Sequence, residues 1–174
     1  MRISPWVHVV PEQGAVPVDL LLPMTGRTYV VRLDGREMGD TDAVFMQFYD
    51  GLRLPDYFGW NWNALFDCLR DLHWLPAEHY VLIIEATDEI LPGDPAGQRL
   101  LFETLVRAGR RWSRTRRSDG VDLSRLVIVM SCAAASVANL REQLRMCWDE
   151  GEGGRVILVE SDLDGVIPSG SSQA

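Results

Sequence analysis

Two short runs of this sequence are apolar at nearly every position, over residues 80–85 and 126–130. A strand with one face in water alternates apolar and polar residues, so uninterrupted runs of this length indicate strands that are covered on both faces. Two further runs read as strands, at 29–33 and 155–160, and helical patterns lie between the strands, at about 41–52, 61–72, 96–113 and 135–148. Strands that alternate with helices predict an α/β fold with a largely parallel sheet.

The two ends of the chain carry weaker signals. Residues 6–10 and 18–22 are mostly apolar and are separated by prolines and a glycine, which predicts one or two further strands, as a hairpin or at a sheet edge. The residues from 167 onward are small and polar, so we expect a flexible tail over 167–174. The remaining residues, 1–166, have the size of a single domain.

Composition narrows the class of protein. The chain has 174 residues, of which 47% are hydrophobic, and its mean hydropathy of −0.04 is typical of a soluble globular protein. No uncharged apolar stretch reaches the roughly 18 residues of a membrane helix, and the N-terminus lacks the features of a signal peptide. We therefore expect a cytoplasmic protein that does not bind membranes. The cysteines, Cys68, Cys132 and Cys147, lack metal-ligand spacing and are expected to be buried, reduced thiols.

Charge is distributed unevenly along the chain. The formal net charge is −8, and residues 34–90 alone hold twelve acidic residues against three basic ones. Residues 91–125 reverse the sign, with eight arginines against four acids, and five of these arginines are crowded near the end of the predicted helix 96–113: Arg110, Arg111, Arg114, Arg116 and Arg117. Arginines at a helix C-terminus complement the helix dipole. A direct nucleic-acid contact would work against the overall negative charge, so we expect none.

One segment, Leu54–Leu72, places distinctive residues on both faces of a predicted helix. At about 100° per residue, one face of helix 61–72 is an apolar stripe that can pack into a core, made of Leu65, Cys68, Leu69 and Leu72. The opposite face carries Trp62, Asn63, Phe66, Asp67 and Arg70. Two aromatic rings beside an amide, a carboxylate and a guanidinium have the composition of a binding surface. A second interpretation stays open, in which a neighbouring element covers Trp62 and Phe66 as additional core.

The sequence also predicts where this helix starts. Pro55 and Gly59 disfavour a helix in the preceding segment. Asn61 is the expected N-cap, because its side chain can accept hydrogen bonds from the unpaired amides of the first turn.

Motifs that carry enzymatic chemistry are absent from the sequence. It contains no Gly-x-x-x-x-Gly-Lys-Ser/Thr, no Gly-x-Ser-x-Gly and no Gly-x-Gly-x-x-Gly. The histidines, His8, His73 and His79, have no partner at metal-ligand spacing, and Cys68 faces the predicted core. We therefore expect no catalytic residue, no metal and no cofactor.

One enzymatic alternative remains. Glu85, Asp88 and Glu89 follow the predicted strand 80–85, at the sheet edge where α/β proteins often place ligand-binding groups. A small carboxylate-dependent metal enzyme would use them.

The segment Leu54–Leu72 resembles the stretch that identifies the barstar family of bacterial ribonuclease inhibitors. That stretch combines Leu-Pro, an acid, two aromatic residues and Gly with a following Asn and the sequence Ala-Leu-(aromatic)-Asp-Cys-Leu. The matching residues are Leu54, Pro55, Asp56, Tyr57, Phe58, Gly59, Asn61, Ala64, Leu65, Phe66, Asp67, Cys68 and Leu69. The order of predicted strands and helices also fits, over roughly residues 28–131.

The resemblance implies a barstar-like layered fold with three core strands in a mostly parallel sheet. The family core would span about residues 28–131, and the segments 1–27 and 132–166 would extend it with an N-terminal strand or hairpin and a C-terminal helix and strand. The implied function is that of a protein inhibitor, not an enzyme, which blocks the active site of a secreted bacterial ribonuclease inside the producing cell.

The resemblance also implies residue roles. Tyr57 would enter the cleft of the ribonuclease, Gly59 and Asn61 would shape the loop, and Asp67 would occupy the phosphate site. Together with the helix face, these give a predicted partner-binding set: Tyr57, Phe58, Gly59, Trp60, Asn61, Trp62, Asn63, Phe66, Asp67 and Arg70.

Two departures from the family pattern bear on the partner. Asn63 stands where the best-known inhibitors carry a second aspartate, so a neutral hydrogen bond would replace a charge-assisted one. Trp60 replaces a polar or acidic residue. A further acid from the next helix aligns ambiguously, with Glu103 in one register and Arg107 in another. An immunity or adaptor protein that binds a toxin of another chemistry is therefore a second hypothesis.

Overall fold

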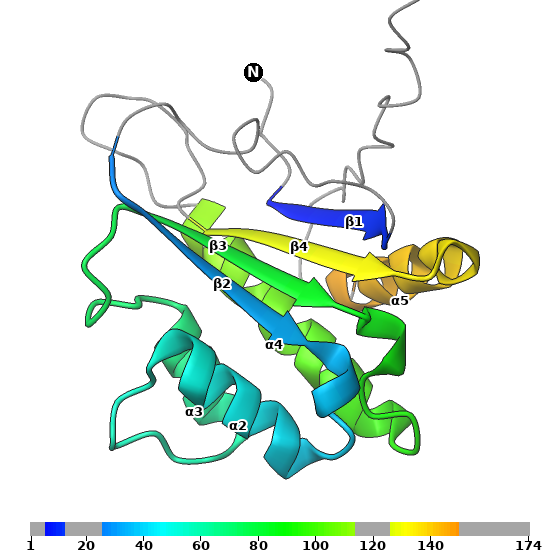
Figure 1. Cartoon of the computed structure of the whole chain (residues 1–174), viewed down its shortest axis with the longest axis horizontal. Coiled ribbons are helices and arrows are strands. Elements are labelled where there is room, and N and C mark those ends of the chain that lie inside the picture. The colour runs from blue at the N-terminus through cyan, green and yellow to red at the C-terminus, as the bar shows by residue number, and fades with distance from the viewer. Residues whose placement is uncertain (1–5, 13–25, 114–125, 150–174) are drawn as a thin grey trace, which may run out of the picture.

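The computed structural model describes residues 6–12, 26–113 and 126–149, which form a parallel four-stranded sheet with helices packed against it (Figure 1). The strand order is β1-β4-β3-β2. The strands are β1 (Val7–Pro11), β2 (Thr28–Asp34), β3 (His79–Glu85) and β4 (Leu126–Cys132). In the described residues the longer helices are α2 (Thr41–Leu52), α3 (Trp62–Leu69), α4 (Pro95–Ser113) and α5 (Val137–Asp149), with short 3-10 turns η1 (Gly35–Glu37), η2 (Thr87–Glu89) and η3 (Ala134–Ser136). The predicted α/β class with a parallel sheet is confirmed.

The strands pair in continuous parallel register. β2 and β3 pair from Thr28 opposite His79 onward, and β3 pairs with β4. β1 lies at the edge of the sheet beside β4, with Val7 opposite Ile128, so an N-terminal edge strand is confirmed. The predicted strands 18–22 and 155–160 and the predicted tail lie outside the described residues, and the division of the chain into a core and two extensions stays a prediction.

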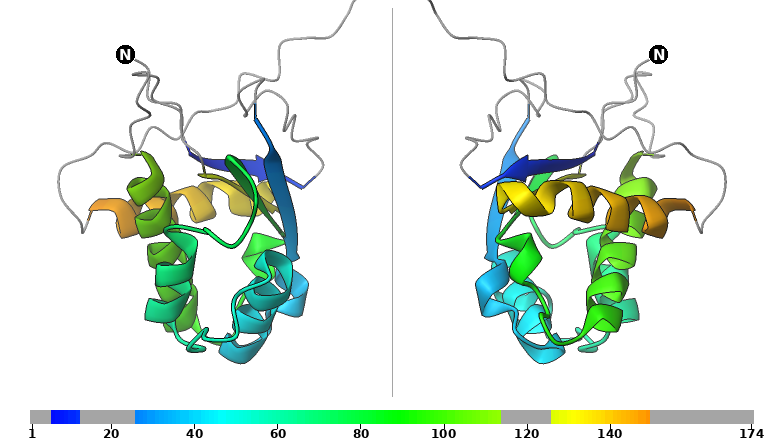
Figure 2. Two further views of the ribbon diagram at one scale, coloured as in Figure 1. Left: turned by 90° about the vertical axis from the view of Figure 1, so that its left-hand side faces the viewer. Right: turned by 90° about the vertical axis from the view of Figure 1, so that its right-hand side faces the viewer.

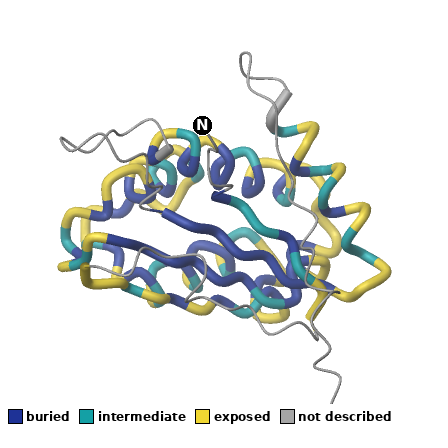
Figure 3. Tube along the Cα trace, turned by 90° about the horizontal axis from the view of Figure 1, so that it is seen from above, coloured by how far each residue is buried: buried dark blue, intermediate teal, exposed yellow. Residues whose placement is uncertain are grey.

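The two faces of the sheet bury different sets of side chains, as the alternation of a strand requires. One face of β3 carries Tyr80, Leu82 and Ile84, which join the main core together with residues from all four helices. The other face carries Val81 and Ile83, which form a second cluster with Val127 and Val129 of β4. Figure 3 shows the central strands as a continuously buried band. Burial on both faces explains why these strands read as uninterrupted apolar runs.

The helices lie close to their predicted positions, with one informative difference. α2 spans the predicted residues, and α4 and α5 differ from prediction by one or two residues at their ends. α3 ends at Leu69, three residues before the predicted end at 72. Just beyond this end, Leu72 adopts a left-handed conformation, with φ of 47°, and its amide donates to the Cys68 carbonyl at 3.2 Å. Leu72 remains fully buried although it lies outside the helix.

α4 is 19 residues long and lies beside α3 (Figure 2). Arg110 and Arg111 occupy its last turn, as predicted from the helix dipole, whereas Arg114, Arg116 and Arg117 lie outside the described residues. No helix in the described ranges has both the length and the apolar character that a membrane span requires.

A tryptophan and a glycine join the N-terminal strand to α4. A Cβ atom on Gly109 would overlap the ring of Trp6, so the missing side chain makes room for the tryptophan. Trp6 is buried against this helix, and its carbonyl accepts a hydrogen bond from the Ile128 amide at 2.7 Å. The edge strand is therefore integrated into the main core.

Candidate functional site

Asn61 organises the loop that precedes α3. Its side-chain oxygen accepts a hydrogen bond from the Ala64 amide at 3.0 Å, which confirms it as the N-cap. Its side-chain nitrogen donates to the Gly59 carbonyl at 2.8 Å. A Cβ on Gly59 would lie 3.2 Å from that nitrogen, so a side chain there would crowd the cap. One asparagine thus fixes both the start of the helix and the path of the loop.

The two adjacent aromatic residues of the loop point in opposite directions. Tyr57 is 70% exposed, whereas Phe58 is 4% exposed and belongs to the main core. The Phe58 ring meets Phe45 of α2 edge to face, with centroids 6.0 Å apart. Phe58, which the sequence places in the partner-binding set, is thus buried beneath the loop, and its part in partner binding stays a prediction. Phe58 holds the loop from beneath, and Tyr57 is the ring that the loop presents.

Trp62 and Phe66 are half-buried. The Trp62 ring packs edge to face on Phe45 of α2, with centroids 4.8 Å apart. The Arg107 guanidinium of α4 lies over Phe66, 4.2 Å from its ring centre. Neighbouring elements cover both rings in part, as the second interpretation of the sequence held.

The polar residues of the same face are exposed. Asn63, Asp67 and Arg70 all reach the surface of α3. The Nε atom of Arg70 lies 3.5 Å from Oδ1 of Asp67, and the Asp67 side chain is 61% exposed. An exposed pair of this kind is worth at most about 1 kcal/mol, so the carboxylate can exchange its partner at little cost.

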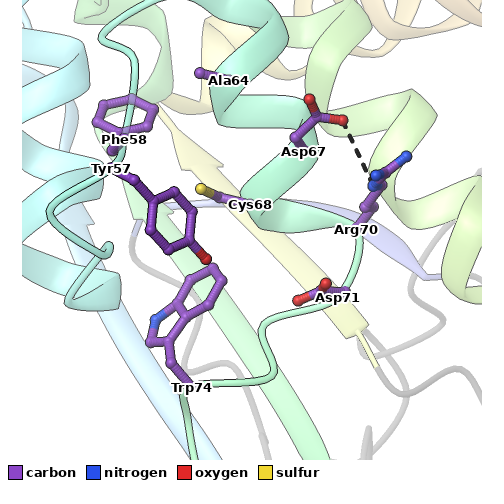
Figure 4. Close-up of a pocket in the computed structure, with 8 residues that line it drawn as sticks. All are labelled: Tyr57, Phe58, Ala64, Asp67, Cys68, Arg70, Asp71 and Trp74. Atoms are coloured by element: carbon purple, nitrogen blue, oxygen red, sulfur yellow. Dashed lines mark ion pairs between the residues drawn. The ribbon is translucent and has the colours of Figure 1, made fainter.

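Tyr57, Asp67 and Arg70 line one hollow of about 280 Å³ (Figure 4). Its remaining lining residues are Phe58, Ala64, Cys68, Asp71 and Trp74. The Tyr57 ring reaches from the loop toward Trp74, while Asp67 and Arg70 project from the α3 side. The hollow therefore places an exposed phenol and an exposed carboxylate on one concave surface.

Asp71 and Trp74 are lining residues that sequence reasoning missed. The Trp74 indole is fixed by its nitrogen, which donates to the Leu52 carbonyl at 3.0 Å. Partial burial raises the pKa of Asp71, but hydrogen bonds from His73 outweigh it, so the net pKa of the carboxyl is lowered. These bonds run from the His73 amide at 2.9 Å and between the ring Nδ1 and the carboxylate at 2.7 Å. No glycine or proline marks the turn at Leu72 that brings both residues to the hollow.

The cysteine at the floor of the hollow is protected. Cys68 is buried, and burial, followed by the negative charges of Asp71 and Asp67, raises the pKa of its thiol. Burial also raises the pKa of Cys132 to about 11. Both are free thiols, as predicted, and Cys147 is half-buried.

The next helix, α4, places an arginine against the outer face of α3. Of the two candidate positions, Arg107 contacts Phe66 of α3. Glu103 lies one turn away, where its carboxylate accepts a hydrogen bond from Arg99 at 2.8 Å. The face that carries Asp67 thus includes two cations of the chain itself, Arg70 and Arg107.

Two of the three predicted carboxylates at and after the end of β3 are engaged in the fold. Glu85 pairs with Arg32 of β2 at 2.8 Å, and Asp88 accepts a hydrogen bond from the Ser136 hydroxyl at 2.7 Å. Within the described ranges, no group of three or more acidic, histidine or cysteine residues is arranged to hold a metal ion.

Comparison with models of known protein families gives a match. No curated protein was found to match the chain. The family model described as "Barstar (barnase inhibitor)" matches residues 28–128, which is more than half of the 174 residues and includes β2, β3, the loop and α3. Members of this family are inhibitors, not enzymes. The chain therefore belongs to the barstar family of ribonuclease inhibitors.

Proposed function

We propose that this protein binds and blocks the active site of a cognate secreted bacterial ribonuclease, inside the cell that produces the enzyme. The observation that carries the proposal is the shared hollow, where Tyr57 from the loop and Asp67 from α3 line one concave surface. The contact would use Tyr57, Trp60, Asn63, Asp67 and Arg70 directly. Gly59, Asn61 and Phe58 would hold the loop, and Trp62 and Phe66 would present their exposed edges.

Charge supports this proposal. A ribonuclease must hold the phosphates of RNA with cationic groups, so an exposed carboxylate can occupy the same place as a phosphate oxygen. The chain has a net charge of −8, and the site lies within its most acidic segment. A negative surface accelerates the encounter with a basic enzyme and makes the association rate sensitive to salt.

Asp67 would contribute a larger share of the binding free energy here than the same aspartate does in an inhibitor with two aspartates. Asn63 precedes it by one helical turn and offers only a neutral amide. Arg70 must release Asp67 or move with it when the enzyme binds, which costs little for an exposed pair.

The test is a titration of the protein into a panel of small secreted bacterial ribonucleases, with barnase included. The rate of RNA hydrolysis is measured at each point of the titration. We expect stoichiometric loss of activity with at least one enzyme. Asp67→Ala should weaken inhibition about a hundredfold or more, because it leaves cationic groups of the enzyme buried without a partner. Inhibition of none of the enzymes, or an unchanged inhibition constant for Asp67→Ala, would contradict the proposal.

A matched control is available on another helix. Glu142 of α5 is also exposed and also pairs with an arginine three residues later, Arg145, at 2.6 Å. Glu142→Ala removes the same charge and the same kind of ion pair away from the hollow. We expect it to change inhibition less than about threefold, as a small surface effect would.

A second candidate function is immunity to a toxin that is not a ribonuclease. The observation in its favour is the exposed Asn63. It stands where an inhibitor that binds a phosphate-binding cleft would be expected to carry a negative charge. Purification of the protein with its natural partner, and identification of that partner, separates the two functions.

A further inference from the structure

Trp60 has an unusual backbone conformation for a large residue. Its φ is 50°, in the left-handed region that favours glycine, and its side chain is 44% exposed. A bulky residue in this region is strained unless the surrounding structure holds it, and such residues concentrate at functional sites. A glycine would suit the backbone better, so the tryptophan side chain must be explained by its contacts.

Those contacts form a rigid stack. The Trp60 ring stacks on Tyr49 of α2, with centroids 5.0 Å apart and an interplanar angle of 28°. It also meets the buried Phe58 ring at 5.3 Å. The Tyr49 hydroxyl lies 3.4 Å from the Asp56 carboxylate, at the far side of the loop. The rings of Tyr49 and Phe58 are thus fixed before any partner binds, and Trp60 keeps much of its surface in solvent.

The sequence around the stack is mostly acidic. Asp42, Met46 and Tyr49 follow one another along one side of α2, and Asp50 and Asp56 are exposed nearby in sequence. Arg53 is the basic residue of this stretch. An exposed indole beside carboxylates is a favourable place for a cation, because the face of the ring attracts positive charge and the carboxylates add to it.

We propose that the Trp60–Tyr49 stack, with Asp56 beside it, receives an arginine or lysine side chain from the rim of the ribonuclease cleft and so extends the binding surface from α3 onto α2. This inference rests on the proposed function, since its partner is the same basic enzyme. Trp60 contacts Phe58, which also lines the hollow, so a protein seated on Tyr57 and Asp67 would lie close to the stack. A rigid, pre-stacked ring loses little side-chain freedom on binding.

The test compares two substitutions of Trp60 that keep the same backbone strain. Trp60→Phe keeps an aromatic face for a cation, whereas Trp60→Leu keeps apolar bulk without one. The probe is the ribonuclease that the wild-type protein inhibits, with barnase tried first. We expect Trp60→Leu to weaken binding about tenfold and Trp60→Phe no more than about threefold. Thermal unfolding of each variant shows whether it is folded at the temperature of the assay.

A double-mutant cycle gives the second readout. Each arginine and lysine at the rim of the enzyme cleft is changed to alanine and measured against wild-type and Trp60→Leu protein. We expect one of these cations to couple to Trp60 by a factor of about three or more, and the others not to couple.

The outcomes separate the inference from the proposed function. If the wild-type protein inhibits the enzyme and all Trp60 variants bind the enzyme with equal affinity, only this inference is overturned. Equal losses in Trp60→Phe and Trp60→Leu, or no coupled cation, also overturn it. Failure of the wild-type protein to inhibit any enzyme of the panel contradicts the proposed function, and this inference with it.

Discussion

The Arg107 guanidinium of α4 lies 4.2 Å from the centre of the Phe66 ring on α3. This contact places a positive charge on the same helix face that presents Asp67. It also explains why Phe66 is half-buried although the helix pattern puts it opposite the core stripe. The surface that we propose for a basic enzyme therefore contains a cation that works against association.

Removal of this cation should favour the complex. We expect Arg107→Gln to accelerate association with the target ribonuclease a few-fold at low salt, because less positive charge then faces the basic enzyme. Loss of the contact with Phe66 should reduce the free energy of unfolding by about 0.5–1 kcal/mol. Stopped-flow association rates and urea unfolding measure the two effects. Arg145→Gln makes the same change in net charge on α5, and an equal acceleration by that variant would show that the position of Arg107 is unimportant.

The contact between Gly109 and Trp6 predicts a sensitive position in the core. Gly109→Ala adds a methyl group that would overlap the Trp6 ring. We expect the free energy of unfolding to fall by about 1–3 kcal/mol, as in other overpacked cores. Gly93→Ala is the control, because no atom lies within 4 Å of the added methyl group. Equal urea midpoints for the two variants would show that β1 does not pack on α4 as described.

Arg53 has a backbone conformation that favours glycine, which gives a prediction for two substitutions. It ends α2 in the left-handed conformation, with φ of 49°, and it is exposed. Arg53→Gly should be more stable than Arg53→Ala by about 1 kcal/mol, because both variants lose the side chain but alanine alone keeps the backbone strain. Thermal unfolding of the pair measures this difference, and a more stable alanine variant would contradict the described conformation.

The cysteines should differ in reactivity. Burial protects Cys68 and Cys132, so a thiol reagent at neutral pH should modify the half-buried Cys147 first and the other two after unfolding. Because the pKa of Cys132 rises from 9.0 to about 11 on folding, its contribution to stability is complete below pH 9 and is lost as the pH rises toward 11. Cys132→Ala should flatten the fall in stability across this interval. Rapid labelling of Cys132 in the native protein would contradict its burial.

The sequence was most reliable where one local pattern settles the structure. The uninterrupted apolar runs predicted β3 and β4 because strands buried on both faces need no polar positions. Asn61 was recognised as a cap because its hydrogen bonds to Ala64 and Gly59 are local in sequence. Tyr57 and Asp67 became candidates through the resemblance to the barstar family, and their shared hollow was not predictable from spacing.

Features that depend on tertiary packing were left open or missed. The partial burial of Trp62 and Phe66 comes from contacts with α2 and α4. The positions of these helices relative to α3 cannot be predicted from the helix pattern. The early end of α3 depends on Leu72, which adopts a left-handed conformation that usually selects glycine. Because residue 72 continues the apolar stripe, the pattern predicted a helix that extends to that residue. Asp71 and Trp74 were therefore not included in the predicted site.

The most direct test of the central claim is competition between this protein and a nucleotide for one site on the enzyme. Binding of the protein to its target ribonuclease is measured at increasing concentrations of a nucleoside 3′-monophosphate, which occupies the phosphate site. If Asp67 replaces a phosphate, the apparent Kd rises in proportion to nucleotide concentration, and the enzyme never holds both ligands. An apparent Kd that is independent of the nucleotide would place the protein elsewhere on the enzyme and contradict active-site inhibition.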